Sequence, residues 1–211
     1  MVSLHLACRN EPAHQVIATI ESLVALDWPA FEVVVVDNNT TDDRLWRPVQ
    51  AHVQALEQRL ERERLEGRAA VRVRFHHLPQ WPGYKAGALN YALAHSDPGA
   101  EWIGVVDADY VVAHDWLRQL GGWFADARVA VLQAPQAHRE WHRRAFERMM
   151  NWEYEGFFRI GMHHRHERNA VVQHGTMTLV RAQALREAGA WDEGNVCEDS
   201  ELGLRLLGHG W

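Results

Sequence analysis

Residues Glu101 to Tyr110 read Glu-Trp-Ile-Gly-Val-Val-Asp-Ala-Asp-Tyr, an apolar run that ends in two carboxylates one residue apart. Residues 103–106 predict a short buried strand, which places Asp107 and Asp109 where that strand leaves its sheet. In open α/β sheets this carboxyl edge is where ligands bind. Two carboxylates this close repel unless a positive charge neutralises them, and Mg²⁺ takes one or two carboxylates and completes its shell with phosphate and water. The stretch therefore predicts a site for a metal and a diphosphate.

A second interpretation of these two carboxylates is structural. An Asp side chain accepts hydrogen bonds from the free N–H groups at the start of a helix, and a helix is expected to begin near His114. For an isolated Asp-x-Asp pair, capping is the commoner role. The choice between the two interpretations depends on the rest of the chain.

The composition indicates one domain with a substantial core. Of the 211 residues, 47% are hydrophobic, which suits one core, and the chain is too short for two domains. The formal net charge of −6 argues against nucleic acid as a partner, because backbone-binding proteins carry a basic excess. Cys8 and Cys197 are the only cysteines, so a reducing compartment is expected. No apolar run approaches the roughly 20 residues of a membrane span, and we expect the chain as given to be soluble.

Strands and helices alternate along the first 135 residues. Strands are expected at 2–7, 31–36, 71–78, 103–106 and 129–133. Helices are expected at 13–26, after 43 with a densely charged second half at 57–68, at 83–95 and at 114–124. This alternation implies an α/β fold with a mostly parallel central sheet flanked by helices. Asp37 then ends a strand at the same edge as Asp107.

After Pro135 the pattern changes. The aromatic segment 138–168 is too charged for a core helix and is expected to lie across the open side of the sheet. A strand is expected at 171–180, followed by a helix at 181–189 that ends in a glycine. Glu198, Asp199 and Glu201 then open a final helix at 202–207, with their charges at its positive end. Because a strand begins at residue 2 and the chain stops just after a helix, we expect a fragment of a longer protein.

Five motifs stand in order along the chain. They are Asp37 closing Val33-Val34-Val35-Val36, Lys85-Ala86-Gly87-Ala88-Leu89-Asn90, Asp107-Ala108-Asp109, Gln173-His174-Gly175-Thr176 and Cys197-Glu198-Asp199. Their order and spacing resemble the processive glycosyltransferases of family 2, which include cellulose, hyaluronan and bacterial β-glucan synthases, and look most similar to the bacterial glucan synthases. The resemblance covers nearly the whole chain. It implies one GT-A catalytic domain, with a nucleotide-sugar half at 1–135 and an acceptor half at 136–211.

The resemblance also implies a reaction. A sugar, glucose in the glucan synthases, would move with inversion from a UDP-sugar to a growing β-glucan or other polysaccharide, with Mg²⁺ or Mn²⁺. Asp37 would accept a hydrogen bond from the uracil ring. Asp107 would lie near the ribose and diphosphate, and Asp109, with Asp107 beside it, would hold the metal. The metal would neutralise charge that builds on the departing UDP.

On the acceptor side, the Glu198-Asp199 pair resembles the catalytic motif of the family. Asp199 matches the general base that removes the acceptor's proton. Cys197 stands where the family usually has Thr, a mild change because the Asp carries the chemistry. His174, Gly175 and Thr176 belong to the segment expected under the acceptor sugar. Because His174 replaces the Cys of cellulose synthases, a different acceptor preference is expected.

Lys85, Asn10 and Glu11 complete the expected substrate-binding set. Lys85 is the only lysine in the chain. It would lie at a helix start, where positive charge and free N–H groups favour the diphosphate, and its structural alternative is an ordinary surface lysine. Asn10 and Glu11 resemble the Asn-Glu pair that follows the first strand in the family, and they are expected to cap the first helix as well.

Two other functions remain open. A sugar nucleotidyltransferase needs a glycine-rich first loop, and residues 8–12 contain no glycine. A nucleotide-sugar-binding domain without activity would be expected to lose Asp109 or Asp199, and both are present. The Gln-x-x-Arg-Trp motif of the family does not occur before the chain ends, which puts the activity of the isolated chain in question. The full-length protein is expected to carry transmembrane helices and to act at the cytoplasmic face of the plasma membrane.

Overall fold

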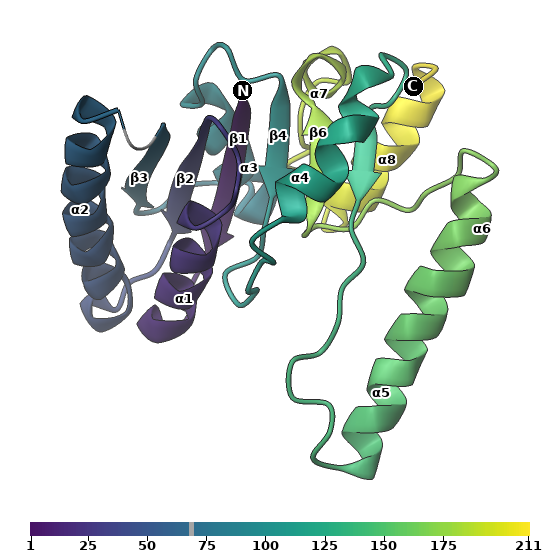
Figure 1. Cartoon of the computed structure of the whole chain (residues 1–211), viewed down its shortest axis with the longest axis horizontal. Coiled ribbons are helices and arrows are strands. Elements are labelled where there is room, and N and C mark those ends of the chain that lie inside the picture. Colours follow the sequence, from purple (N-terminus) through teal and green to yellow (C-terminus); the bar gives the residue numbers. More distant parts are fainter. Residues whose placement is uncertain (68–69) are drawn as a thin grey trace.

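The computed structural model describes residues 1–67 and 70–211, and within them six strands form one sheet in the order β3-β2-β1-β4-β6-β5 (Figure 1). In chain order they are β1 (Val2–Cys8), β2 (Phe31–Asn38), β3 (Val71–Leu78), β4 (Trp102–Val105), β5 (Val131–Gln133) and β6 (Thr178–Arg181). Strands β1 to β4 are parallel, and β6 runs antiparallel to both β4 and β5. The expected α/β fold with a mostly parallel sheet is confirmed.

Helices cover both faces of this sheet. They are α1 (Ala13–Val24), α2 (Asp43–Leu65), α3 (Tyr84–Ala94), α4 (Trp116–Gly121), α5 (Ala145–Gly156), α6 (His163–His166), α7 (Ala182–Glu187) and α8 (Glu198–Gly208), with a 3₁₀ turn η1 (Gly122–Ala125) and a π-helix η2 (Phe157–Met162). Alternate residues of β2 serve the two faces. Val33 and Val35 pack in the core beneath α1 and α2, whereas Val34 and Val36 pack against α3. Helix α2 ends at Leu65, and Arg68, the last residue of the expected charged stretch, lies outside the described residues.

The expected strand at 171–180 is wrong over most of its length. Strand β6 begins only at Thr178, because its partner β4 ends opposite that residue, at Val105. The backbone groups of the preceding residues are bound by a side chain instead. Gln133 accepts the N–H of His174 (2.8 Å) and donates to the carbonyl of Thr176 (3.0 Å). Residues 171–177 therefore form a supported loop at the carboxyl edge of the sheet.

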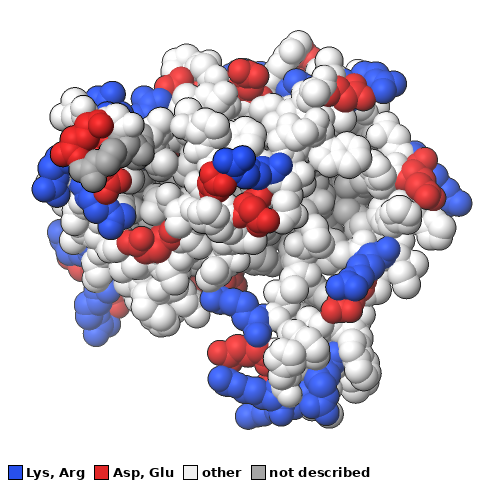
Figure 2. Space-filling model, viewed as in Figure 1, with Lys and Arg blue, Asp and Glu red and all other residues white. Residues whose placement is uncertain are grey.

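The expectation that the segment 138–168 lies across the open side of the sheet is wrong. Helices α5, η2 and α6 form one continuous rod that projects from the body (Figure 1). Its ring contacts with the body are those of Phe157 and Phe158 with His174, and of His166 with Trp123. Figure 2 shows basic side chains, all of them Arg, gathered at the lower end of this rod. Its dense charge keeps the segment in solvent rather than on the apolar sheet.

Two smaller expectations about helix ends have different outcomes. Gly189 has a φ of +85° just after α7, so the expected glycine end of that helix is confirmed. The last helix starts at Glu198, four residues earlier than expected, so that Glu198, Asp199 and Glu201 lie in its first turn rather than ahead of it.

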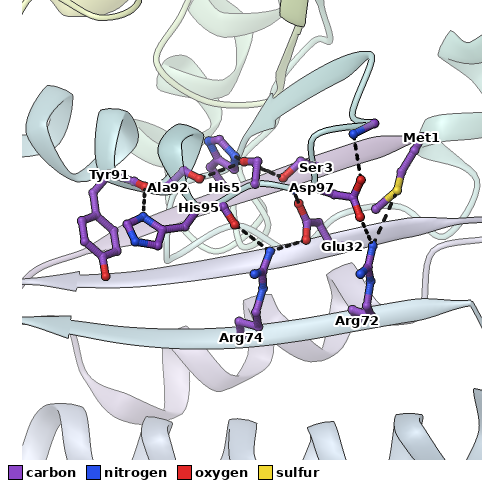
Figure 3. A network of polar contacts seen from close by, with 12 residues as sticks. Met1, Ser3, His5, Glu32, Arg72, Arg74, Tyr91, Ala92, His95 and Asp97 are labelled. Atoms are coloured by element: carbon purple, nitrogen blue, oxygen red, sulfur yellow. Dashed lines mark hydrogen bonds and ion pairs between the residues drawn. The ribbon is translucent and has the colours of Figure 1, made fainter.

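A polar network ties α3 to the sheet at the opposite, amino edge (Figure 3). Glu32 of β2 is fully buried, and its carboxylate accepts from Arg74 of β3 (2.5 Å) and from the N–H of Asp97 (2.5 Å). His5 of β1 lies beside it, with Nε2 2.7 Å from Oγ of Ser96. The network holds the turn after α3 on three strands, which leaves the carboxyl edge free for the site.

Candidate active site

Two neighbouring cavities lie at the carboxyl edge of the sheet, within the described residues. The carboxylate cavity has a volume of about 390 Å³, and its lining includes Glu11, Lys85, Asp107 and Asp109. The Trp46 cavity has a volume of about 700 Å³, and its lining includes Trp46, His77 and Trp81. Arg9 lines both cavities. The fold thus brings three of the five motifs, from β2, α3 and β4, to one edge.

Lys85 joins the two halves of the chain. It is the second residue of α3, and its ammonium group donates to a carboxylate oxygen of Asp107 (2.5 Å) and to the carbonyl of Gly175 (2.8 Å). A Cβ added at Gly175 would lie 3.1 Å from Lys85 Nζ and 3.2 Å from a carboxylate oxygen of Asp199. Lysine, carboxylates and glycine therefore meet at one point. Lys85 is not an ordinary surface lysine, and the structural alternative for it is wrong.

Asp107 and Asp109 differ in their surroundings. Asp107 is half-buried, and its N–H donates to Oγ1 of the buried Thr176 (2.9 Å). The side chain of Asp109 is exposed, and within the described residues its carboxylate has no hydrogen bond or ion pair. Helix α4 begins at Trp116 without a side-chain cap. The interpretation that the two carboxylates cap this helix is therefore wrong.

The chemistry of these two carboxylates fits a divalent cation that is shared with phosphate. Within the described residues, no three His, Cys, Asp or Glu side chains converge into a complete protein metal site. Mg²⁺ does not require one, because it is commonly held by one or two carboxylates together with substrate phosphates and water. If such a cation bound, Asp109, which has no protein partner to give up, would be the better placed ligand, and Asp107 in the same cavity would be the second.

The predicted catalytic pair opens α8. Asp199 is partly buried, and one of its oxygens accepts the N–H of Ser200 (2.7 Å) while the other faces Gly175. Glu198 is buried behind it. Burial raises the pKa of Glu198, and the charges of Asp199 and Asp107 add to this effect while that of Lys85 opposes it. Of the two carboxylates, Asp199 is the more accessible.

His174 belongs to the loop 171–177 and packs against the projecting rod. Its ring centroid is 5.2 Å from that of Phe157 and 5.4 Å from that of Phe158. Burial lowers the pKa of His174, although the charge of Asp199 opposes this shift. Its Nε2 is buried and has no hydrogen-bond partner within the described residues. The imidazole is thus held neutral beside Asp199, with one polar atom still to be paired.

The remaining predicted binding residues lie on the first two strands. Asp37 is 4% exposed, and its two carboxylate oxygens are taken by Oγ1 of Thr40 (2.6 Å) and Nδ1 of His77 (2.7 Å). The side chains of Asn10 and Glu11 do not cap α1, because its N-cap residue is Pro12 and no side chain bonds there. That expectation is wrong: a φ of +57° at Asn10 turns the chain away, and its N–H donates to Thr40 instead.

Sequence reasoning missed four residues at this edge. Trp46 and His77 stack with ring centroids 4.0 Å apart, and both line the Trp46 cavity. Arg9 lines both cavities, and Arg139 donates to the carbonyl of Asp109 (2.9 Å). None of the four belongs to one of the five motifs. The available signal was the adjacency of Arg9 to Asn10 and of His77 to the end of a predicted strand.

This sheet, with carboxylates at the ends of its strands and a lysine at the start of α3, defines a GT-A-type glycosyltransferase domain. The crystal structure of residues 1–349 of S. aureus TarS has the same fold, with a TM-score of 0.55 and 17% identity over 97% of this chain and 54% of that chain. Structures of TarS 1–349 in complex with UDP and with UDP-GlcNAc are also similar. Residues 3–189 match Glycosyl transferase family 2, and the chain belongs to that family.

Curated relatives include both lipid and polysaccharide enzymes. A β-monoglucosyldiacylglycerol synthase of Synechocystis sp. is 30% identical over 219 residues, covering 100% of this chain and 41% of the relative. The UDP-forming cellulose synthase 1 catalytic subunit of Komagataeibacter xylinus is 27% identical over 79% of this chain and 23% of the relative. The chain thus spans about two fifths or less of these relatives. Among the described residues, the helices are too short or too polar to cross a membrane.

Proposed function

We propose that this domain transfers glucose, with inversion, from UDP-glucose to a growing β-glucan or other polysaccharide, aided by Mg²⁺ or Mn²⁺, with Asp199 as the general base. The observation that carries the proposal is that Lys85 contacts residues from both halves of the chain. Its ammonium group touches Asp107 of the donor motif and Gly175 of the acceptor loop, directly beside Asp199. A donor and an acceptor held on the two sides of this point would be within reach of each other.

On the donor side, the diphosphate would lie in the carboxylate cavity. Gly83 is the N-cap of helix α3 and provides no side-chain cap, so the N–H groups of the first turn are available to phosphate oxygens, as is the ammonium group of Lys85. Asp109 and Asp107 would hold the cation, which would supply positive charge to the departing diphosphate. Glu11, in the lining, and the neighbouring Asn10 would face the donor from the first strand.

On the acceptor side, Asp199 would take the proton of the attacking hydroxyl. The new bond forms between that oxygen and the anomeric carbon, while the bond from the anomeric carbon to the diphosphate breaks and its electron pair leaves with UDP. Lys85 would offset the charge that develops on the leaving group. Glu198 is the neighbouring carboxylate, and burial disfavours its charged form, so Asp199 would be the proton acceptor of the pair.

The relatives favour one second candidate for the acceptor. A β-monoglucosyldiacylglycerol synthase is similar over the whole chain, and the projecting rod exposes the large apolar side chains of Phe146, Met149, Trp152 and Ile160. Glucosyl transfer to diacylglycerol would use the same donor site and the same base. Incubation with labelled UDP-glucose separates the two, because the label enters an organic extract in one case and an insoluble polymer in the other.

The test is Asp199→Asn in the complete natural protein. The substitution keeps the size of the side chain and the bond to the N–H of Ser200, but it removes the proton acceptor. We expect turnover to fall by roughly two to four orders of magnitude, with UDP affinity unchanged. Asp192→Asn, at an exposed Asp in the preceding loop, is the matched control and should keep full turnover. If Asp199→Asn retained turnover within a fewfold, Asp199 would be only a helix-capping residue.

A further inference from the structure

Asn90 closes the 85–90 motif, and the proposed function gives it no role. It lies on α3 and is half-buried. Its side-chain amide pairs with both main-chain groups of Trp191, because Oδ1 accepts the N–H (3.1 Å) and Nδ2 donates to the carbonyl (2.9 Å). Nδ2 also donates to a carboxylate oxygen of Glu193 (2.8 Å). One side chain of α3 therefore binds the end of the 188–191 turn, which follows α7.

Arg205 of α8 binds the same turn from the other side. Its guanidinium group donates to the carbonyls of Ala188 and Ala190, the latter at 2.8 Å. The guanidinium is itself fixed by Glu201 of α8, whose two carboxylate oxygens accept from it at 2.5 Å and 2.7 Å. Asn90 and Arg205 thus connect two helices through a single turn.

The backbone of this turn needs such support. Gly189 and Ala190 both have a positive φ, of +85° and +62°. Alanine rarely adopts this conformation, and it persists only where surrounding contacts hold it. Trp191 follows directly, is 3% exposed, and packs in one core cluster with Leu89 of α3 and Leu202 of α8. The turn is therefore a supported spacer between α3 and α8.

These two helices carry groups that the proposed reaction must bring together. Lys85 lies in the first turn of α3, and Asp199 lies in the first turn of α8. A shift of the spacer would move α8 against α3, and with it the general base against the sugar donor. Misplacing a catalytic group by about 1 Å can cost about 10²-fold in rate.

We propose that Asn90 is a positioning residue for the general base. Through the 188–191 turn and Arg205, it sets where Asp199 stands relative to a sugar donor bound beside Lys85. This inference rests on the proposed function, which makes Asp199 the base. Asn90 itself touches neither donor nor acceptor. Loss of its contacts therefore lowers kcat and leaves the affinity for UDP unchanged.

The test is Asn90→Asp in the complete natural protein. The new carboxylate keeps an acceptor for the N–H of Trp191, but it opposes the carbonyl of Trp191 and the carboxylate of Glu193. We expect kcat to fall by at least about tenfold, while UDP affinity, measured by calorimetry, stays within about twofold of the wild type. At lower pH the introduced acid is protonated and donates again, so the ratio of variant to wild-type kcat should rise.

Asn195→Asp is the matched control, with the same substitution and the same added charge. Asn195 lies exposed in the loop that follows the turn, and its Oδ1 accepts the N–H of Cys197 (2.9 Å). A carboxylate oxygen serves this N–H equally well. The control should therefore keep the wild-type kcat, and its ratio to the wild type should not change with pH.

Arg205→Lys tests the other half of the connection. Lysine keeps the positive charge beside Glu201, but its single ammonium group cannot span the carbonyls of Ala188 and Ala190 as the guanidinium does. We expect a similar loss of kcat at unchanged UDP affinity. Because both residues act through one turn, the double variant with Asn90→Asp should lose little more than the worse single variant.

The outcomes separate the two proposals. If the wild-type protein neither binds UDP nor transfers sugar, the proposed function fails and this inference fails with it. If the wild type is active and the folded single variants keep kcat within about twofold, the turn does not position Asp199 and only this inference is overturned. Losses that add in the double variant, or that appear in UDP affinity rather than in kcat, would overturn it equally. If Asn90→Asp does not fold, Arg205→Lys decides alone.

Discussion

His5 makes both of its polar contacts through one ring nitrogen: Nε2 lies 2.7 Å from Oγ of Ser96 and 3.2 Å from Oγ of Ser3. Oγ of Ser96 donates to the carbonyl of Ala92 (2.8 Å), so it must accept the hydrogen that His5 Nε2 carries. Nδ1 is then a bare lone pair, buried without a partner in the described structure. Burial, assisted by the positive charge of Arg74, lowers the pKa of His5 to about 3. The ring is a neutral part of the core, and protonating it costs stability.

This environment predicts a pH-dependent stability. The unfolded chain binds a proton at the ordinary His pKa of 6.5, whereas the folded chain binds it only near pH 3. Between these values the unfolded state holds more protons, so the free energy of unfolding should fall by about 1.4 kcal/mol for each unit the pH is lowered. The contribution is complete above 6.5 and is lost as the pH falls toward 3. Urea titrations of the wild type and of His5→Gln, across this range, measure it.

The variant should show a shallower slope, because Gln keeps a donor for Ser96 but does not titrate. His209→Gln, at an exposed histidine, should keep the wild-type slope. Equal slopes in His5→Gln and the wild type would mean that other groups control the acid sensitivity.

Gly175 tests the space between Lys85 and Asp199. The Cβ of Gly175→Ala would be only 3.1 Å and 3.2 Å from their charged groups, so one of them must shift by some tenths of an ångström. We expect sugar transfer to fall by at least about tenfold, since misplacing catalytic groups is costly, while the melting temperature changes little. Gly208→Ala in α8, where a Cβ meets nothing within 4 Å, is the control for activity and stability.

At the scale of elements, α3 is positioned by a glycine contact. A Cβ on Gly87 would lie 2.0 Å from the carbonyl oxygen of Pro82, a backbone atom that cannot move alone. Gly87→Ala should push the 79–82 loop away from α3 and destabilise the fold by about 1–3 kcal/mol. Because Lys85 lies two residues earlier on the same helix, UDP affinity should fall too. Thermal melts and calorimetry measure both effects.

Gly104→Ala in β4 is the matched comparison for that experiment. Its Cβ would meet the side-chain ends of Leu4 and Leu179, at 2.5 Å and 2.8 Å, in a part of the core that does not include the buried residues of α3. It should cost comparable stability and leave UDP affinity intact. If Gly87→Ala behaved in the same way, α3 would not set the position of Lys85.

The elements of residues 1–135 could be predicted, because the strands are short apolar or alternating runs and the helices between them show apolar residues at helical spacing. Residues 171–177 could not, since strand formation there depends on the length of β4, which ends at Val105. The site divides in the same way. Asp107, Asp109 and Lys85 are contiguous with recognisable motifs, whereas His77 and Trp46 come together only through the packing of α2 on β3.

At the scale of the whole molecule, the candidate site draws on both halves of the chain, because Lys85 contacts Asp107 in the first and Gly175 in the second. Asp109 is exposed and unpaired within the described structure, so Asp109→Ala should change stability by no more than about 0.5 kcal/mol. It should nevertheless abolish the gain in UDP affinity that Mg²⁺ gives the wild type. Titration of UDP with and without Mg²⁺ checks this. Equal affinity with and without Mg²⁺ in the wild type would contradict metal-assisted binding.

The ion pair of Lys85 with Asp107 also provides a chemical reporter. Lys85 is the only lysine of the chain, so amine-directed reagents have one side chain to modify besides the amino terminus. Reductive methylation with a ¹³C label would place a single lysine signal in an NMR spectrum, at the point where the two halves of the chain meet. Occupancy of the site could then be followed from one resonance, in a crude mixture and without any substitution.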